Sequence, residues 1–295
     1  KTTVTVTDNK TDPDTGIAGV DITTLKYQWI QSSAKPTEES FKTATYKGIF
    51  TNPTAEEITS PENENGNDWY LWILAKDKLG NTAIIGQGPY YLDSAIPTIT
   101  AIPNTNQENG KNQNVVKQLD VTLKFEDELY EANVSLSGLR DDNVYEYYLS
   151  TSSDSLTGGT FTTITPTGDA NLKTANITIG QAQTGIRYLF VRTVFDKSDN
   201  ESGDANSWVT SGGAHYQMVG TYIFDNTAPV VSFEPNGEST WKQEQITNVT
   251  VQDNDGTTPD TGVAGVKTST VKYRWVQGTS TLTKDNFANG EERAY

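Results

Sequence analysis

The chain has 295 residues, 34% of them hydrophobic, and no cysteine, which excludes disulfides, thiolate metal sites and a cysteine nucleophile. Its formal net charge is −16, so phosphate backbones are repelled and nucleic acid is not an expected partner; calcium ions or simple solubility suit this balance. No apolar run approaches the length of a membrane span, so no membrane insertion is expected in this segment.

Residues 2–7 alternate threonine with valine, a period of two that predicts a half-buried strand. After a loop with proline and glycine, a second strand is predicted over 22–31, with Leu25, Tyr27 and Trp29 on its core face. Weaker strands are predicted over 43–51 and 56–59.

The most apolar stretch of the chain, Trp-Tyr-Leu-Trp-Ile-Leu-Ala over 69–75, predicts a central strand. A turn over 77–81, a strand over 83–92 and a linker over 93–97 should follow. The inward set of the central strand is expected to be Trp69, Leu71, Ile73 and Ala75.

The middle of the chain repeats this order with different residues. Strands are predicted over four stretches, 97–103, 119–125, 145–150 and 187–196. The sequence over 222–229 then repeats the spacing of Tyr, Asp and Pro found over 90–97, so a third unit should begin near Pro229.

An internal repeat relates the two ends of the chain. Gly16 and Gly262 are 246 residues apart, as are Trp29 and Trp275, and similar sequences surround each pair. We therefore expect three modules: 1–94, lacking its first strand; 95–226, longer and divergent; and 227–295, homologous to the first and truncated at its C-terminal end. Such a chain is expected to be a window on a longer tandem array.

Short strands, frequent turns and little helical periodicity predict an all-β fold of sandwiches in a row. Lys-Tyr-Gln-Trp over 26–29, Trp-Tyr-Leu-Trp over 69–72 with Ala-Lys-Asp-Lys-Leu-Gly-Asn over 75–81, and Asp-Ser-Ala-Ile-Pro over 93–97 carry a resemblance. The chain resembles the bacterial immunoglobulin-like (Ig-like) tandem repeats of large Gram-positive cell-surface, S-layer and adhesin-stalk proteins. The middle module departs from the pattern, with Leu149 and Arg187 in place of tryptophans. The resemblance implies Ig-like β-sandwich modules that act as extracellular spacers and assembly surfaces.

The chain carries no recognisable catalytic constellation. His215 is the single histidine, and no nucleophile elbow, phosphate loop or dinucleotide fingerprint occurs. We therefore expect not an enzyme but a structural, non-catalytic segment of a secreted or surface-displayed bacterial protein: a stalk, S-layer or filament building block related to adhesion. The alternative is a carbohydrate-binding accessory module of a secreted polysaccharide-degrading enzyme, with Trp208, His215 and Tyr216 as a stacking platform.

Acidic and amide side chains recur in the loops and at the module junctions, where calcium could take oxygens from them. At the junctions we expect Asp77 and Asn81 to meet Asp93, and Asp196 with Asn200 to meet Asp225. The alternative for all of them is ordinary turn chemistry. The candidate calcium ligands are Asp8, Asn9, Asp14, Asp77, Asn81, Asp93, Asp196, Asp225, Asp253, Asn254 and Asp260.

An interface is predicted on the middle module, where aromatic residues should face outward. The candidates are Tyr148, Tyr188, Phe190, Trp208 and Tyr216. The expected partners are neighbouring copies or modules of the same protein, with a host or glycan ligand as a further possibility. The first strand missing from module one should come from upstream residues or, alternatively, from a neighbouring chain.

Overall fold

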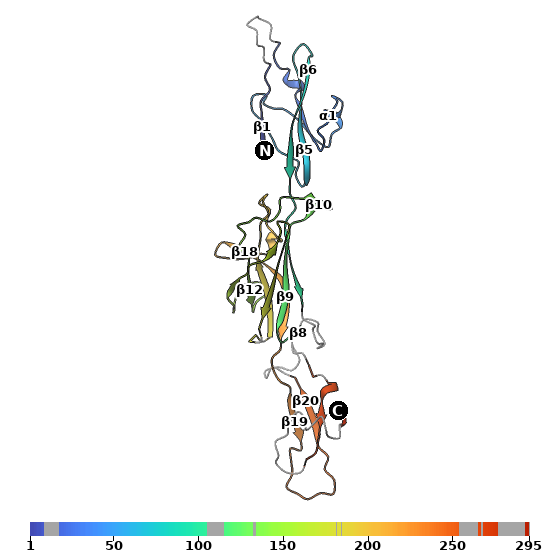
Figure 1. Cartoon of the computed structure of the whole chain (residues 1–295), viewed down its shortest axis with the longest axis vertical. Coiled ribbons are helices and arrows are strands. Elements are labelled where there is room, and N and C mark those ends of the chain that lie inside the picture. Colours follow the sequence, from blue (N-terminus) through green and yellow to red (C-terminus); the bar gives the residue numbers. More distant parts are fainter. Residues whose placement is uncertain are drawn as a thin grey trace.

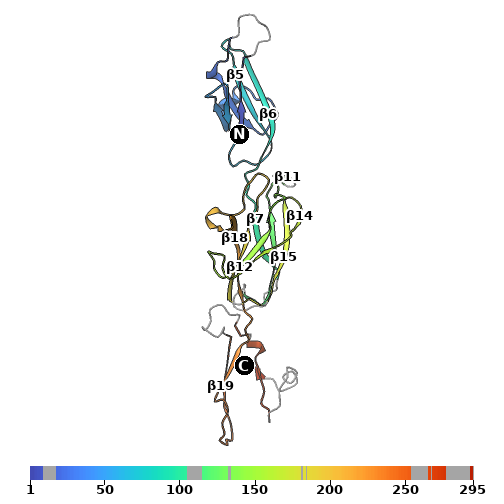
Figure 2. The ribbon, with the colours of Figure 1, turned by 90° about the vertical axis from the view of Figure 1, so that its left-hand side faces the viewer.

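The computed structural model describes residues 1–8, 18–104, 115–131, 134–180, 182–183, 185–253, 265–266, 268–276 and 293–294. The chain forms an elongated row in which three groups of strands follow one another along the long axis (Figure 1). A quarter turn shows the same row (Figure 2). Within the described ranges, β1–β6, β7–β18 and β19–β22 pair only inside their own groups, which we call the N-terminal, central and C-terminal segments.

The N-terminal segment places a four-stranded antiparallel sheet, of order β3-β2-β5-β6, over a two-stranded one formed by β1 and β4. Its elements are β1 (Thr2–Val4), η1 (Ile22–Thr24), β2 (Lys26–Ile30), α1 (Ser40–Thr43), β3 (Tyr46–Ile49), β4 (Glu56–Ile58), β5 (Gly66–Lys76) and β6 (Thr82–Leu92).

Strand β5 is apolar on both faces because each face covers a separate core. Trp69 and Leu71 lie on one face with Leu25 and Trp29, and Ile73 and Ala75 pack beside them, as the sequence predicts. On the other face, Trp72 and Leu74 pack against Phe41 of α1. The apolar pattern of this strand therefore reflects two cores.

The central segment consists of two large sheets and a small two-stranded sheet formed by β10 and β11. The first has the order β14-β15-β9-β7, and the second has the order β13-β12-β16-β18-β17 with β8 beside β18. Their strands are β7 (Thr98–Pro103), β8 (Val115–Val116), β9 (Leu119–Glu126), β10 (Leu129–Glu131), β11 (Val134–Ser135), β12 (Glu146–Ser150), β13 (Phe161–Thr163), β14 (Thr167–Gly168), β15 (Leu172–Ile179), β16 (Gly185–Arg192), β17 (Val209–Ser211) and β18 (Ala214–Phe224); η2 (Ala205–Ser207) precedes β17.

A single core lies between these two sheets. Strand β9 alternates buried and half-buried residues along its whole length, which confirms the strand predicted from its sequence. Its Val121 and Leu123 pack with Leu189 and Val191 of β16 on the opposite sheet. The fold is all-β and predominantly antiparallel, apart from the parallel pairing of β8 with β18.

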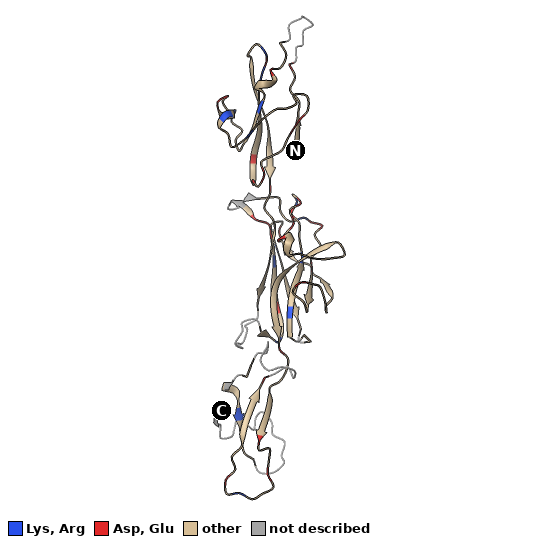
Figure 3. Ribbon diagram, turned by 180° about the vertical axis from the view of Figure 1, so that it is seen from behind, with Lys and Arg blue, Asp and Glu red and all other residues tan. Residues whose placement is uncertain are grey.

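The C-terminal segment pairs β19 (Val230–Glu234) with β20 (Asn248–Gln252) and β21 (Lys272–Tyr273) with β22 (Arg293–Ala294), and η3 (Thr268–Thr270) precedes β21. Acidic positions are spread over the length of the row, with basic positions scattered among them (Figure 3). No helix among the described residues is long and apolar enough to cross a membrane.

Candidate metal centre

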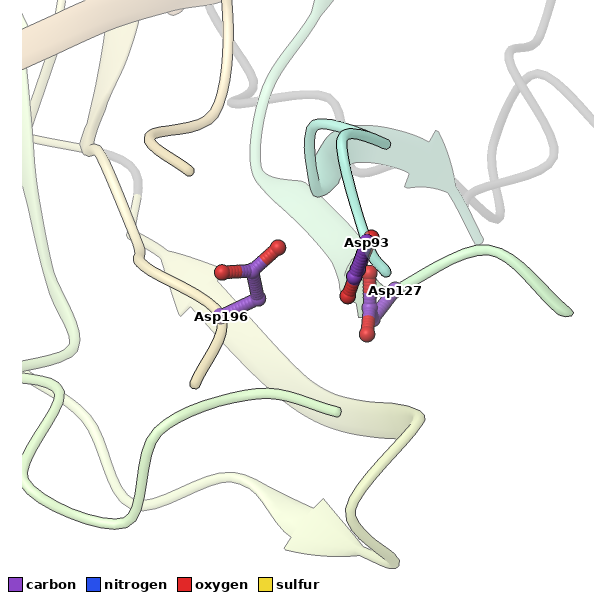
Figure 4. A group of neighbouring side chains, drawn as sticks. All are labelled: Asp93, Asp127 and Asp196. Carbon is purple, nitrogen blue, oxygen red and sulfur yellow. The ribbon is translucent and has the colours of Figure 1, made fainter. Parts of the chain in front are cut away.

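Three aspartates from two segments converge where the N-terminal segment meets the central one (Figure 4). Asp93 follows the last strand of the N-terminal segment, β6, whereas Asp127 follows β9 and Asp196 follows β16 of the central segment. One carboxylate oxygen from each lies within 4.8 Å of the others. Asp127 and Asp196 are buried, and Asp93 is half-buried. We call this group the junction cluster.

Backbone amides fix the position of each carboxylate. Asp127 Oδ2 accepts a hydrogen bond of 2.6 Å from the Gly138 amide. Asp196 Oδ1 accepts from the amides of Ser198 and Asn200, at 2.8 and 2.9 Å. The cluster is thus held by the loops that follow β11 and β16 in the central segment.

The linker is tied to the same loops. Asp93 Oδ2 accepts from the Ser137 amide at 2.9 Å. The side-chain amide of Asn200 donates to the backbone oxygen of Asp93 at 3.1 Å and to Asp196 Oδ2 at 2.7 Å. Asp93 is therefore held by the segment that follows it in the chain, rather than by the segment that it ends.

The electrostatics of the cluster favour a cation. Burial, together with the negative charges of Asp93 and Asp196, raises the pKa of Asp127 to about 6. Burial also raises the pKa of Asp196, and the charge of Asp93 adds to this effect. Asp127 Oδ1 is buried without a hydrogen-bond partner, and none of the ion pairs in the described part of the chain involves the cluster.

The spacing suits a calcium ion. Calcium binds six to eight oxygens at about 2.3–2.6 Å, so oxygens on opposite sides of the ion are about 5 Å apart. Three carboxylate oxygens within 4.8 Å of one another can therefore surround one ion. The unpartnered oxygen of Asp127 is the group that such an ion would satisfy.

Both expected junction pairings are wrong, for one geometric reason. Asp77 and Asn81 form the turn at one end of the β5–β6 hairpin, and Asp93 follows its other end, where Gly66 pairs with Leu92. Strand β5 has 11 residues, so about 30 Å of strand lies between them. Asp196 and Asp225 are separated in the same way along the pairing of β16 with β18.

The turn and loop geometry of the cluster recurs in the N-terminal segment. Asp77 accepts from the amides of Leu79 and Asn81 just as Asp196 accepts from Ser198 and Asn200. Asp8 Oδ2 accepts from the Gly19 amide at 2.7 Å, and in the C-terminal segment Asp253 Oδ2 accepts from Gly265 at 2.8 Å. The remaining candidates Asn9, Asp14, Asn254 and Asp260 lie outside the described residues.

Asp127 was missed by the sequence analysis, although the sequence contains a signal for it. An aspartate ends an alternating strand at Asp8, Asp127 and Asp253 alike. A glycine lies eleven or twelve residues after each aspartate, between a small residue and a branched aliphatic one, over 18–20, 137–139 and 264–266. Aligning the strand ends of all three segments would have found the third carboxylate.

The predicted outward aromatic set is also corrected by the structure. Tyr148, Phe190 and Tyr216 are buried in a second cluster on the outer face of the β12-β16-β18 sheet, and Tyr188 packs against it. The loop after β12 covers them: Leu156 packs on the cluster, and the Gly159 amide donates to the Tyr148 hydroxyl. These rings therefore stabilise the segment and are not an exposed interface.

Trp208 is the remaining aromatic candidate. Its ring stacks on His215, with centroids 4.5 Å apart. Nδ1 of His215 lies 2.8 Å from Glu201 Oε1. One face of the indole is thus occupied inside the protein, which reduces the surface left for a sugar ring.

The Gly138 loop offers a direct test of how the cluster is built. Gly138 has φ of +78°, and a Cβ there would lie 3.1 Å from the Ala170 side chain. We expect Gly138→Ala to lower the free energy of unfolding by about 2 kcal/mol or more, because left-handed strain costs about 1–2 kcal/mol before any crowding. Denaturant titration of the variant and the unmodified chain measures this difference in the free energy of unfolding.

Gly212→Ala is the matched control, since Gly212 also has positive φ but nothing within 4 Å of its Cβ position. It should show the strain cost alone and leave calcium affinity unchanged, whereas Gly138→Ala should weaken calcium binding. Equal losses of stability and affinity in the two variants would contradict this role for the Gly138 loop.

Comparison of the chain with protein-family models, with curated protein sequences and with solved structures finds no match in any of the three.

Proposed function

We propose that the chain is a structural, non-catalytic segment of a secreted or surface-displayed bacterial repeat protein. In this proposal each segment is an Ig-like β-sandwich module, and calcium braces the junction between neighbouring modules. The junction cluster carries the proposal, because it takes one carboxylate from the N-terminal segment and two from the central one. A cation there holds two modules in one orientation.

The architecture supports this role. The elongated row (Figure 1) is the shape expected of a spacer or stalk. The two sheets of the central segment enclose one core, as in a sandwich module. In this proposal the cation lies between modules, and its ligands come from strand ends and turns. It therefore stabilises the joint, whereas hydrophobic packing stabilises the sandwich cores.

Calcium should raise the melting temperature of the chain relative to excess chelator, because an ion that binds only the folded form stabilises it by mass action. Asp93→Asn should abolish most of this difference. Asp141→Asn removes the same charge from an exposed position in a nearby loop and should preserve it. Scanning calorimetry of the three proteins makes the comparison, and identical melting with and without calcium in the unmodified chain would rule out the cation brace.

Carbohydrate binding is the rival function, and Trp208 is the residue that separates the two. Because Trp208 stacks on His215, only the opposite face of the indole ring is left for stacking on a sugar. On a glycan array we expect no saturable binding by the unmodified chain. Saturable binding that Trp208→Ala removes would instead establish the rival.

A further inference from the structure

The joint between the central and C-terminal segments repeats the chemistry of the first joint. Asp225 follows β18, the last strand of the central segment, as Asp93 follows β6. Asp225 Oδ1 accepts from the Thr227 amide at 3.0 Å, and Asp93 Oδ1 accepts from the Ala95 amide at 3.1 Å. Both linker aspartates thus adopt the same local turn.

Asp253 corresponds to Asp127 on the receiving side. It follows β20 as Asp127 follows β9, and a glycine amide with φ near +80° binds Oδ2 in each. Asp253 is 9% exposed, and its Oδ1 is buried without a hydrogen-bond partner. A buried oxygen without a partner points to a missing ligand, independently of the negative charge of the carboxylate.

The side chains of Asp225 and Asp253 interact across the joint. Asp225 is 8% exposed. Asp253 and Asp225 share a side-chain hydrogen bond, so their carboxyl groups lie in direct contact. Burial, the negative charge of Asp225 and this hydrogen bond raise the pKa of Asp253. Two buried carboxylates in such proximity repel each other unless a proton or a cation lies between them.

We propose that Asp225 and Asp253 form a second calcium site at the joint between the central and C-terminal segments. The inference extends the proposed function from one braced joint to two, and it rests on that function for its role. Two carboxylates, with water and backbone oxygens completing the shell, bind calcium more weakly than the three of the junction cluster. The chain should therefore bind calcium in two steps.

Calorimetric titration of the full chain with calcium chloride at pH 7.5, after treatment with chelator, tests the proposal. We expect two ions per unmodified chain, with affinities that differ at least tenfold. Asp253→Asn should remove the weaker step and Asp127→Asn the tighter one. The double variant should bind no ion.

Glu234→Gln is the control, because it removes one exposed negative charge from β19 of the same segment. It should retain both steps. Asp225→Asn serves as the second variant if Asp253→Asn does not fold, and it should also remove the weaker step. The Gly265 amide resonance reports directly on Asp253: it should shift with calcium in Asp127→Asn but not in Asp253→Asn.

The outcomes separate this inference from the proposed function. One ion per chain, removed by Asp127→Asn and retained by Asp253→Asn, would overturn the second site and leave the junction cluster intact. Loss of the weaker step in Glu234→Gln as well would show general charge attraction and overturn the second site. Binding of no ion by the unmodified chain would overturn both.

Discussion

Replacing Asp127 with asparagine is expected to stabilise the central segment by about 3 kcal/mol at pH 7.5 when all divalent cations are chelated. The pKa of Asp127 is raised to about 6 in the folded chain, about two units above that of a free aspartate. Each unit corresponds to about 1.4 kcal/mol, so ionising Asp127 in the folded state costs about 3 kcal/mol. Asparagine keeps an acceptor for the Gly138 amide without the charge.

The pH dependence follows from the direction of the shift. Because the folded pKa is raised, the folded state holds a proton that the unfolded state has lost, and stability falls as pH rises from about 4 through about 6. The unmodified chain in chelator should lose stability over this range relative to Asp127→Asn, and the two should converge near pH 4. Hydrogen exchange of the β9 amides measures the opening free energy of the central segment at each pH.

Saturating calcium should reverse the order of the two proteins. Calcium binds the unmodified cluster, and a thousandfold excess over the dissociation constant adds about 4.1 kcal/mol. This gain exceeds the deficit of about 3 kcal/mol in chelator, whereas the variant gains little. Asp141→Asn is the control for net charge and should follow the unmodified chain in every condition. A variant that is less stable in chelator at pH 7.5 would show that the cluster carries no electrostatic strain.

Phe190→Ala is expected to lower the stability of the central segment by about 3–5 kcal/mol, the usual cost of removing a buried phenylalanine ring. Phe190 is 0% exposed between Tyr148 and Tyr216 in the second aromatic cluster. The loss should be independent of calcium, since the ring lies in a cluster separate from the three aspartates. Urea unfolding with and without calcium measures both properties.

Ile186→Ala is the matched control on the same strand. Ile186 is 43% exposed, so its truncation should cost well under half as much. If Phe190 instead lay exposed in an interface, Phe190→Ala would leave the stability of the segment unchanged and would reduce association between chains. That result would restore the outward orientation predicted from the sequence.

The strands could be predicted because their signals are local. The alternation over 119–125 and the apolar stretch over 69–75 each require nothing beyond the residues in the strand, and both became strands. The expectation that Phe190 faces outward failed because alternation distinguishes two faces of a sheet but not what covers them. The loop after β12 covers that outer face, and α1 covers the outer face of β5.

The metal candidates show a different limit. The residue type alone was sufficient to select Asp93 and Asp196 as candidates. Which aspartates lie close together, however, depends on the direction of each strand in the sheet. An antiparallel hairpin puts its turn and its exit at opposite ends, so Asp93 meets Asp196 of the following segment rather than Asp77 of its own. Partner choice is a property of topology and follows only after the strand order is known.

Each linker aspartate lies against an aspartate of the segment that follows it. Under the proposed calcium brace, this arrangement predicts how the bending of the row depends on calcium. The length of the row depends on the strands, which the ions do not hold together, so its contour length should be independent of calcium. The joints determine the bending stiffness, because the linker carboxylates lie there. Under the proposed calcium brace, persistence length should therefore rise with calcium at constant contour length, and the same sequence would act as a flexible tether at low calcium and as a stiff strut at high calcium.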